Sequence, residues 1–240
     1  MATLKGQITS DVEVVASFNG SMRGYRIPEW CRIVEQQTNI GGRVQWMLGP
    51  LITKGDYLWM LGDDDRVMPG GVSEVLSCLA DDPGMVLMHD GEYDLGVPMG
   101  SRFDSYGDLI TAQRDNGRAA AITAHTLCAA TVFARDSFDL QEAVLRCDSM
   151  YGQHYAMLTN LFQEHVRVVS KPTFWAGSSM EASIWSHSTE MQAEHVNAYP
   201  LNIYRLIEWI SECSGVALNP VECWVPGDGF DSPWRPNVHL

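Results

Sequence analysis

The sequence has little positive charge, no long apolar run and no paired-cysteine motif. Sixteen lysines and arginines stand against thirty aspartates and glutamates, which gives a formal net charge of −14 at pH 7. Such an acidic chain disfavours a broad binding surface for nucleic acid or for an anionic membrane, although a local basic patch is compatible with it. The acidic residues are spread along the chain, so most of them are expected on a solvated surface.

Other absences narrow the class of protein further. The six cysteines form no CxxC pair and have no zinc-ligand spacing, so each is expected to pack as a small apolar side chain in a reducing compartment. The longest weakly polar stretch, residues 119–134, contains His125 and threonines and is too polar for a membrane span. Met1 is followed by ATLKGQITSD and not by the apolar core of a signal peptide. These features predict a soluble, cytoplasmic protein.

The apolar residues that are present predict an α/β fold. A chain of 240 residues, 45% of them hydrophobic, is long enough for one large domain with a substantial core. Strand-like runs alternate with helix-like ones, which is typical of layered α/β architectures. Strands are predicted over residues 11–17, 56–62, 84–90, 166–175 and 221–225, and helices over residues 42–55, 70–80, 149–164 and 199–215.

Three consecutive aspartates, Asp63, Asp64 and Asp65, follow the apolar run YLWMLG. Ligands of open α/β sheets bind beyond the carboxyl ends of strands, and Mg²⁺ or Mn²⁺ is commonly held by one or two carboxylates together with substrate phosphates. An EF-hand loop does not fit, because Val67 stands at its fifth position. The alternative is a charged cap near the N-terminus of the helix that follows Pro69.

The wider stretch NIGGRVQWMLGPLITKGDYLWMLGDDDRVMPGG resembles the nucleotide-sugar half of family 2 glycosyltransferases with the GT-A fold, especially the branch of abequosyltransferase-like enzymes whose strand ends in LGDDD. DVEVVASFNGS resembles the second strand of that family and its D-N-G-S-like turn. The resemblance is good over residues 11–79 and weaker up to about residue 185. It implies one GT-A domain over residues 1–240, with a mostly parallel sheet. Residues 11–90 and 221–240 would form the nucleotide-sugar part, 91–197 the acceptor side and 198–215 a helix.

The resemblance also implies a site. Asp65 is the first expected ligand for Mn²⁺ or Mg²⁺ and Asp63 the second, while Asp64 is either a ligand or a scaffold residue. Asn19, Asn39, Gly41, Asp63 and Asp64 are expected to contact a UDP- or GDP-sugar. Phe18 stands where the family often has an acidic residue that contacts the base, so stacking on Phe18 or a hydrogen bond from Asn19 is expected instead.

An inverting enzyme also needs a general base for the acceptor hydroxyl. The family places an acidic residue near the position of Asp148, and His154 is the second candidate. Their structural alternatives are a helix N-cap for Asp148 and a partly buried, hydrogen-bonded histidine for His154. His187 is a candidate late metal ligand, or a plain loop histidine.

The leading functional hypothesis is a metal-dependent glycosyltransferase that moves a sugar from a nucleotide-sugar to a hydroxyl of a glycan, a lipid-linked sugar, a protein or a modified nucleobase. The alternatives are a non-catalytic nucleotide-sugar-binding domain and a nucleotidyltransferase. The chain begins close to the family's second strand, so a circular permutation is a further hypothesis. It makes 221–225 the first strand of the sheet and brings Asp228 to the base, against the alternative of a shortened domain with an unrelated tail.

Overall fold

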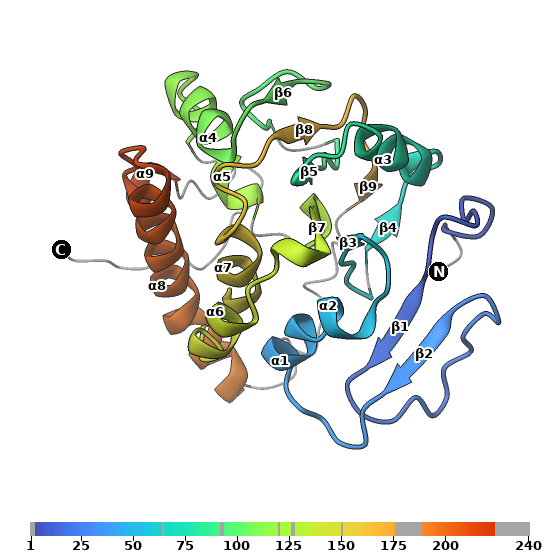
Figure 1. The fold of residues 1–240 in the computed structure, drawn as a ribbon. Coiled ribbons are helices and arrows are strands. Elements are labelled where there is room, and N and C mark those ends of the chain that lie inside the picture. Colours follow the sequence, from blue (N-terminus) through green and yellow to red (C-terminus); the bar gives the residue numbers. More distant parts are fainter. Residues whose placement is uncertain are drawn as a thin grey trace.

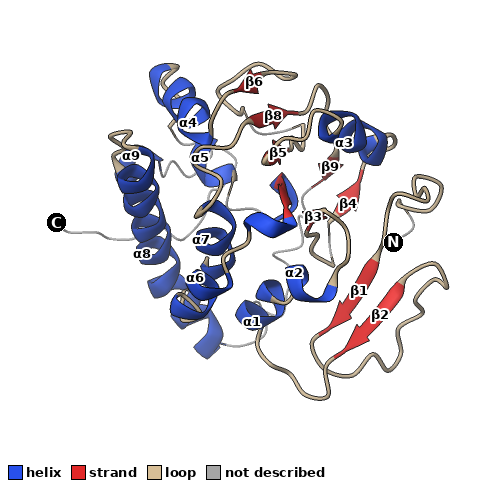
Figure 2. Ribbon diagram, in the orientation of Figure 1, coloured by secondary structure: helices blue, strands red, loops and turns tan. Residues whose placement is uncertain are grey.

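The structure is a computed structural model, and it describes residues 3–63, 65–91, 94–119, 121–125, 128–149, 151–175 and 189–223. Its strands are β1 (Val15–Phe18), β2 (Arg32–Glu35), β3 (Tyr57–Trp59), β4 (Arg66–Val67), β5 (Met85–Leu87), β6 (Arg102–Phe103), β7 (Thr131–Ala134), β8 (Val166–Val168) and β9 (Phe174–Trp175). Its helices are α1 (Gly42–Met47), α2 (Gly49–Ile52), α3 (Gly71–Leu79), α4 (Tyr106–Asp115), α5 (Ala121–Ala124), α6 (Leu140–Leu145), α7 (Gly152–Leu158), α8 (Thr189–Ser214) and α9 (Pro220–Cys223). Strands and helices alternate along much of the chain, which confirms the predicted α/β class (Figure 2).

The larger sheet has five strands in the order β3-β7-β5-β8-β6. Strands β5 and β8 pair in parallel, whereas β7 is antiparallel to both of its neighbours and β6 is antiparallel to β8. Strands β3, β5 and β8 therefore share one direction. The strand predicted over residues 56–62 is β3, but its partner in the sheet is the antiparallel strand β7, because an apolar run predicts burial and not the direction of the neighbouring strand.

Helices cover both faces of this sheet. Met85 and Leu87 of β5 are fully buried in a hydrophobic cluster with residues of α4, α7 and α8. Val86 belongs to a second cluster, which includes Val75 of α3. Since side chains alternate between the two faces of a strand, a strand covered on both sides is apolar at every position, as β5 is.

Strands β1 and β2 form a separate parallel pair, in register from Val15 with Arg32 to Phe18 with Glu35. We call this pair the ribbon. In Figure 1 the ribbon lies on the opposite side of the view from α8. Ala16 is the only buried residue of its two strands. Parallel strands are usually covered on both faces, so the ribbon depends on its attachment to the rest of the protein.

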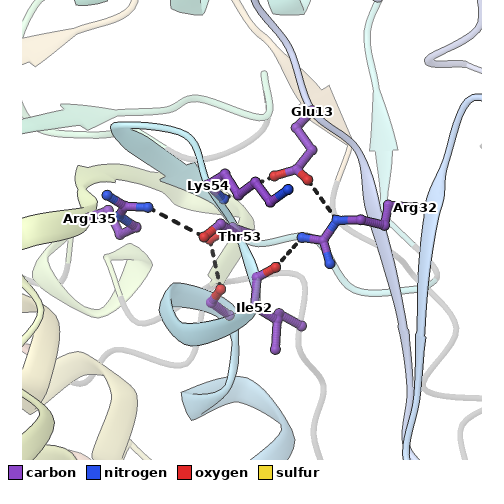
Figure 3. Close-up of polar contacts among 7 residues, drawn as sticks. Glu13, Arg32, Ile52, Thr53, Lys54 and Arg135 are labelled. Atoms are coloured by element: carbon purple, nitrogen blue, oxygen red, sulfur yellow. Dashed lines mark hydrogen bonds and ion pairs between the residues drawn. The ribbon is translucent and has the colours of Figure 1, made fainter.

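Glu13 and Arg32 fasten the ribbon to the segment between α2 and β3 (Figure 3). Arg32 Nε donates to Glu13 Oε1 at 2.7 Å, and Arg32 Nη2 donates to the carbonyl oxygen of Ile52. Glu13 Oε2 accepts from the backbone N–H of Lys54 at 3.0 Å. The hydrogen bond from Arg32 lowers the pKa of the Glu13 carboxyl. We call Glu13, Arg32, Ile52 and Lys54 the clasp.

The chain between β1 and β3 starts at the carboxyl end of β1 and returns to the amino end of β1. The Ile40 backbone N–H donates to Asn19 Oδ1 at 2.7 Å, beyond the carboxyl end of β1, whereas Lys54 lies at the clasp before its amino end. Helix α2 runs from Gly49 toward the clasp. Strand β3 runs in the opposite direction, because Met60, directly after β3, lies beside Gly49: a Cβ on Gly49 would be 3.1 Å from the Met60 sulfur. The carboxyl ends of β1 and β3 therefore point toward the same end of the molecule.

Two predicted elements are divided at a proline. The helix predicted over residues 42–55 is split into α1 and α2, because Pro50 has no backbone N–H to continue the helical hydrogen bonds. The strand predicted over residues 166–175 is split into β8 and β9, and Pro172 lies between them.

The strand predicted over residues 221–225 is wrong over 221–223, where the structure has helix α9. Asn219 begins this helix: its carbonyl oxygen accepts from the N–H groups of Glu222 and Cys223. Pro220 follows as the first helical residue, a position that proline favours. Cys223 is fully buried in the cluster with α8, while residues 224 and 225 lie outside the described residues. The partner of β1 among the described residues is β2, and the circular permutation stays unconfirmed.

Candidate functional site

Three of the residues predicted to contact the nucleotide-sugar lie together between β1 and α1, namely Asn19, Asn39 and Gly41. Asn19 Oδ1 accepts from the Ile40 N–H at 2.7 Å, and Asn39 Oδ1 accepts from the Gly41 N–H at 2.8 Å. Gly41 precedes α1 with a φ of 86°, in the left-handed region that glycine adopts without strain. Both side-chain oxygens therefore accept hydrogen bonds from the backbone. The amide N–H₂ groups are the hydrogen-bond donors that these side chains can offer to a ligand.

The aspartate turn follows directly after β3. Asp63 is exposed, and Asp65 is half-buried with its Oδ2 accepting from the Gly62 N–H at 2.7 Å. The Asp65 N–H in turn donates to the Gly62 carbonyl at 3.3 Å, so the turn is closed on itself. Asp64 lies outside the described residues. Within the described part of the chain, no three His, Cys, Asp or Glu side chains lie close enough together to form a metal site of their own.

Asp148 lies in the turn between α6 and α7 and is exposed. Arg43 of α1 reaches this turn, since its Nη1 donates to the Asp148 carbonyl at 2.6 Å. Helix α1 also packs tightly on α7, because a Cβ on Gly152 would lie 2.3 Å from Met47 Cε. The predicted base therefore lies within reach of the Arg43 side chain, which extends from the first turn of α1.

Arg43 itself was not predicted as a site residue. The signal for it is present in the sequence, since it is the basic residue of the first helical turn directly after Asn39–Gly41. Arg43 supplies a positive charge at the end of the molecule where the residues predicted to contact the nucleotide-sugar lie.

His154 occupies the interior and not the surface. It is 2% exposed, its ring lies 5.6 Å from that of Tyr151, and burial lowers its pKa to about 4. It is therefore neutral at pH 7 and out of reach of a hydroxyl that arrives from solvent. This placement argues against His154 as the general base and favours Asp148. His187 and Asp228, the other two predicted site residues, lie outside the described residues.

No family model matches the sequence, and no curated protein matches it. Among solved structures, the chain is similar to the crystal structure of S. aureus TarS 1–349, with a TM-score of 0.43 and 16% identity, over 80% of this chain and 56% of that chain. Among the described residues, no helix combines the length and the apolar character that a membrane span requires.

Proposed function

We propose that this protein is a metal-dependent glycosyltransferase, which transfers a sugar from a nucleotide-sugar to an acceptor hydroxyl. One observation carries the proposal. The turns after β1 and β3 point to one end of the molecule, and Arg43 brings Asp148 to the same end. These are the residues in which the sequence resembles family 2 glycosyltransferases, and they come from three separate stretches of the chain.

The aspartate turn fits a cation that is shared with a diphosphate. Asp63 is exposed, and the described residues form no cage of three protein ligands. Mg²⁺ and Mn²⁺ commonly take only one or two carboxylates and fill their other positions with water and phosphate oxygens. Asp65 and Asp63 would hold the cation, which would neutralise the charge that develops on the leaving nucleoside diphosphate.

The residues of the chain supply the remaining chemistry. Asp148 is exposed, its backbone carbonyl contacts the Arg43 side chain, and its carboxylate can accept the proton of an acceptor hydroxyl as a general base. Arg43 holds the backbone of the Asp148 turn and adds a positive charge beside the expected diphosphate. The amide groups of Asn19 and Asn39 contribute hydrogen-bond donors to the nucleotide side of the site.

The test is release of nucleoside diphosphate from a panel of UDP- and GDP-sugars, with the full chain, Mn²⁺ and a set of hydroxyl acceptors. We expect turnover of at least one donor, its loss in EDTA, and slow turnover in Asp148→Asn. Tight donor binding without turnover across the panel would favour a non-catalytic nucleotide-sugar-binding domain. An absence of both binding and turnover would overturn the proposal.

A further inference from the structure

An open hollow with polar walls lies at the carboxyl end of the ribbon. Its lining comes from the turn after β1 and from the end of β2, namely Ser21, Arg23, Glu35, Gln36 and Gln37. None of these residues belongs to the proposed catalytic machinery. Glu35 is the only carboxylate among them, so the kind of ligand that the hollow can bind depends on the groups that surround Glu35.

An aromatic pair stands beside Glu35. Phe18 and Glu35 are register partners in the parallel ribbon, so their side chains emerge on the same face. The pairing continues one residue further, where the Gln36 N–H donates to the Phe18 carbonyl at 3.0 Å. The Tyr25 ring lies 5.4 Å from the Phe18 ring and is 64% exposed. A flat aromatic surface therefore lies next to Glu35, which lines the hollow.

The backbone restrains the Glu35 carboxylate. Its Oε1 accepts from the Met22 N–H at 3.1 Å. A carboxylate has about four lone-pair sites, so this single bond orients the group and leaves it able to accept two more hydrogen bonds from a ligand. Asn19, the base contact expected from the sequence, has its side-chain oxygen engaged with the Ile40 N–H instead.

Building on the proposed function, we propose that this hollow binds the base of the donor nucleotide and that Glu35 selects guanine, so that the donor is a GDP-sugar. Guanine presents two adjacent donors, N1–H and N2–H₂, which match the two oxygens of one carboxylate. Uracil places its single N3–H between two carbonyl oxygens, and adenine and cytosine place a ring acceptor beside their amino group, so each of these bases brings an acceptor against Glu35. The hollow is also lined by side chains that carry donors for guanine O6, namely Ser21, Arg23, Gln36 and Gln37. The exposed ring of Tyr25, next to Phe18, offers a stacking surface.

The experiment measures the dissociation constants of GDP, UDP, ADP and CDP by calorimetry in Mn²⁺, for the full chain and three variants. Glu35→Gln keeps an oxygen that can accept from the Met22 N–H but loses one of the two acceptors that guanine needs. Tyr25→Ala removes the stacking surface, and Glu29→Gln is the matched exposed control. Thermal unfolding of each variant checks that the fold is retained.

We expect GDP to bind about tenfold or more tightly than UDP, since a site built for a hydrogen bond rejects a ligand that leaves its polar groups unpaired. Glu35→Gln should weaken GDP about tenfold and UDP little, Tyr25→Ala should weaken both by a similar factor, and Glu29→Gln should change neither. If no nucleoside diphosphate binds, the proposed function fails and this inference fails with it. If UDP binds as tightly as GDP, or if Glu35→Gln leaves the preference for GDP intact, only the inference on Glu35 is wrong.

Discussion

The five-stranded sheet and the two-stranded ribbon each contain a pair of parallel strands, yet the two pairs differ in burial. All three residues of β5 are inaccessible to solvent, whereas Ala16 is the only buried residue of β1 and β2. Helices enclose the sheet on both faces, and the polar clasp holds one end of the ribbon. The difference indicates that the sheet supplies most of the stability, while the ribbon leaves its carboxyl end accessible to a ligand.

The same contrast holds for ionisable groups. In the sheet half, burial lowers the pKa of His154 to about 4, and burial together with the nearby His154 lowers that of His125 to about 3. In the ribbon half, the hydrogen bond from Arg32 lowers the pKa of Glu13. The buried histidines His125 and His154 are thus neutral at pH 7, and the clasp keeps the Glu13 carboxylate charged.

A pair of phenylalanine substitutions tests the difference in burial most strongly. Phe133 of β7 is fully buried in the main cluster, whereas Phe18 of β1 is half-buried and contacts Tyr25. Phe133→Ala should lower the free energy of unfolding by about 3–5 kcal/mol. Phe18→Ala should lower it by about 1 kcal/mol or less, since its ring loses little buried area. Urea unfolding measures both, and equal costs would break the comparison.

Asp148→Asn tests the assignment of the general base. Loss of that base should lower turnover by about 10² or more, which corresponds to about 2.7 kcal/mol in the activation free energy. Donor affinity should change little, because the substitution keeps the shape of the side chain and the carbonyl that Arg43 contacts.

Asp104→Asn, at another exposed aspartate, is the control for Asp148→Asn and should leave both quantities unchanged. A full rate in Asp148→Asn together with a large loss in His154→Ala would transfer the role to the histidine.

The buried histidines predict how stability depends on pH. Both have a folded pKa below the ordinary value of 6.5, so their contribution to stability is complete above pH 6.5 and is lost as the pH falls toward 4. Each should reduce the free energy of unfolding by up to about 1.4 kcal/mol per pH unit in that range. His154→Leu removes one of the two titrations and should reduce the slope by about half, as measured by urea unfolding between pH 7.5 and 4.5. A slope that is unchanged in this variant would contradict the assignment.

The smallest expected effect concerns the clasp. Arg32 and Glu13 are about one-third exposed, so Arg32→Met should cost about 1 kcal/mol or less in global stability. It should instead let the ribbon open locally and speed amide hydrogen exchange over Val15–Phe18, while Met85–Leu87 stays protected. Arg114→Met breaks an ion pair with the adjacent Asp115 and is the control, without effect on the ribbon. Unchanged exchange in Arg32→Met would show that other contacts hold the ribbon.

The sequence predicts which helices and strands are buried better than it predicts which strands pair with each other in the sheet. The apolar runs and Pro69 predict β3, α3 and β5, because burial on both faces leaves a continuous apolar pattern. The insertion of β7 between β3 and β5 is not predictable from those runs, since strand order depends on contacts between distant segments. VECWV has a strand-like composition, but Asn219 and Pro220 before it favour the helix that forms.

The site is predictable where a motif is local. Asn39 and Gly41 shape the start of α1 through their own backbone, so their grouping follows from the sequence. The contact between Arg43 and Asp148 joins residues 105 positions apart, and no local pattern reveals it. Glu35 was not predicted because its relation to Phe18 depends on the register of the ribbon.

The most direct test of the account is nucleotide affinity with and without a divalent cation. Three carboxylates after β3 would repel a diphosphate unless a cation lies between them. We expect the nucleoside diphosphate that binds best in Mn²⁺ to bind about tenfold or more weakly in EDTA. Asp65→Asn in Mn²⁺ should weaken it more than Asp64→Asn does. If affinity is the same in Mn²⁺ and in EDTA, and Asp65→Asn binds as the unaltered chain does, the aspartate turn is not a metal site for a nucleotide-sugar.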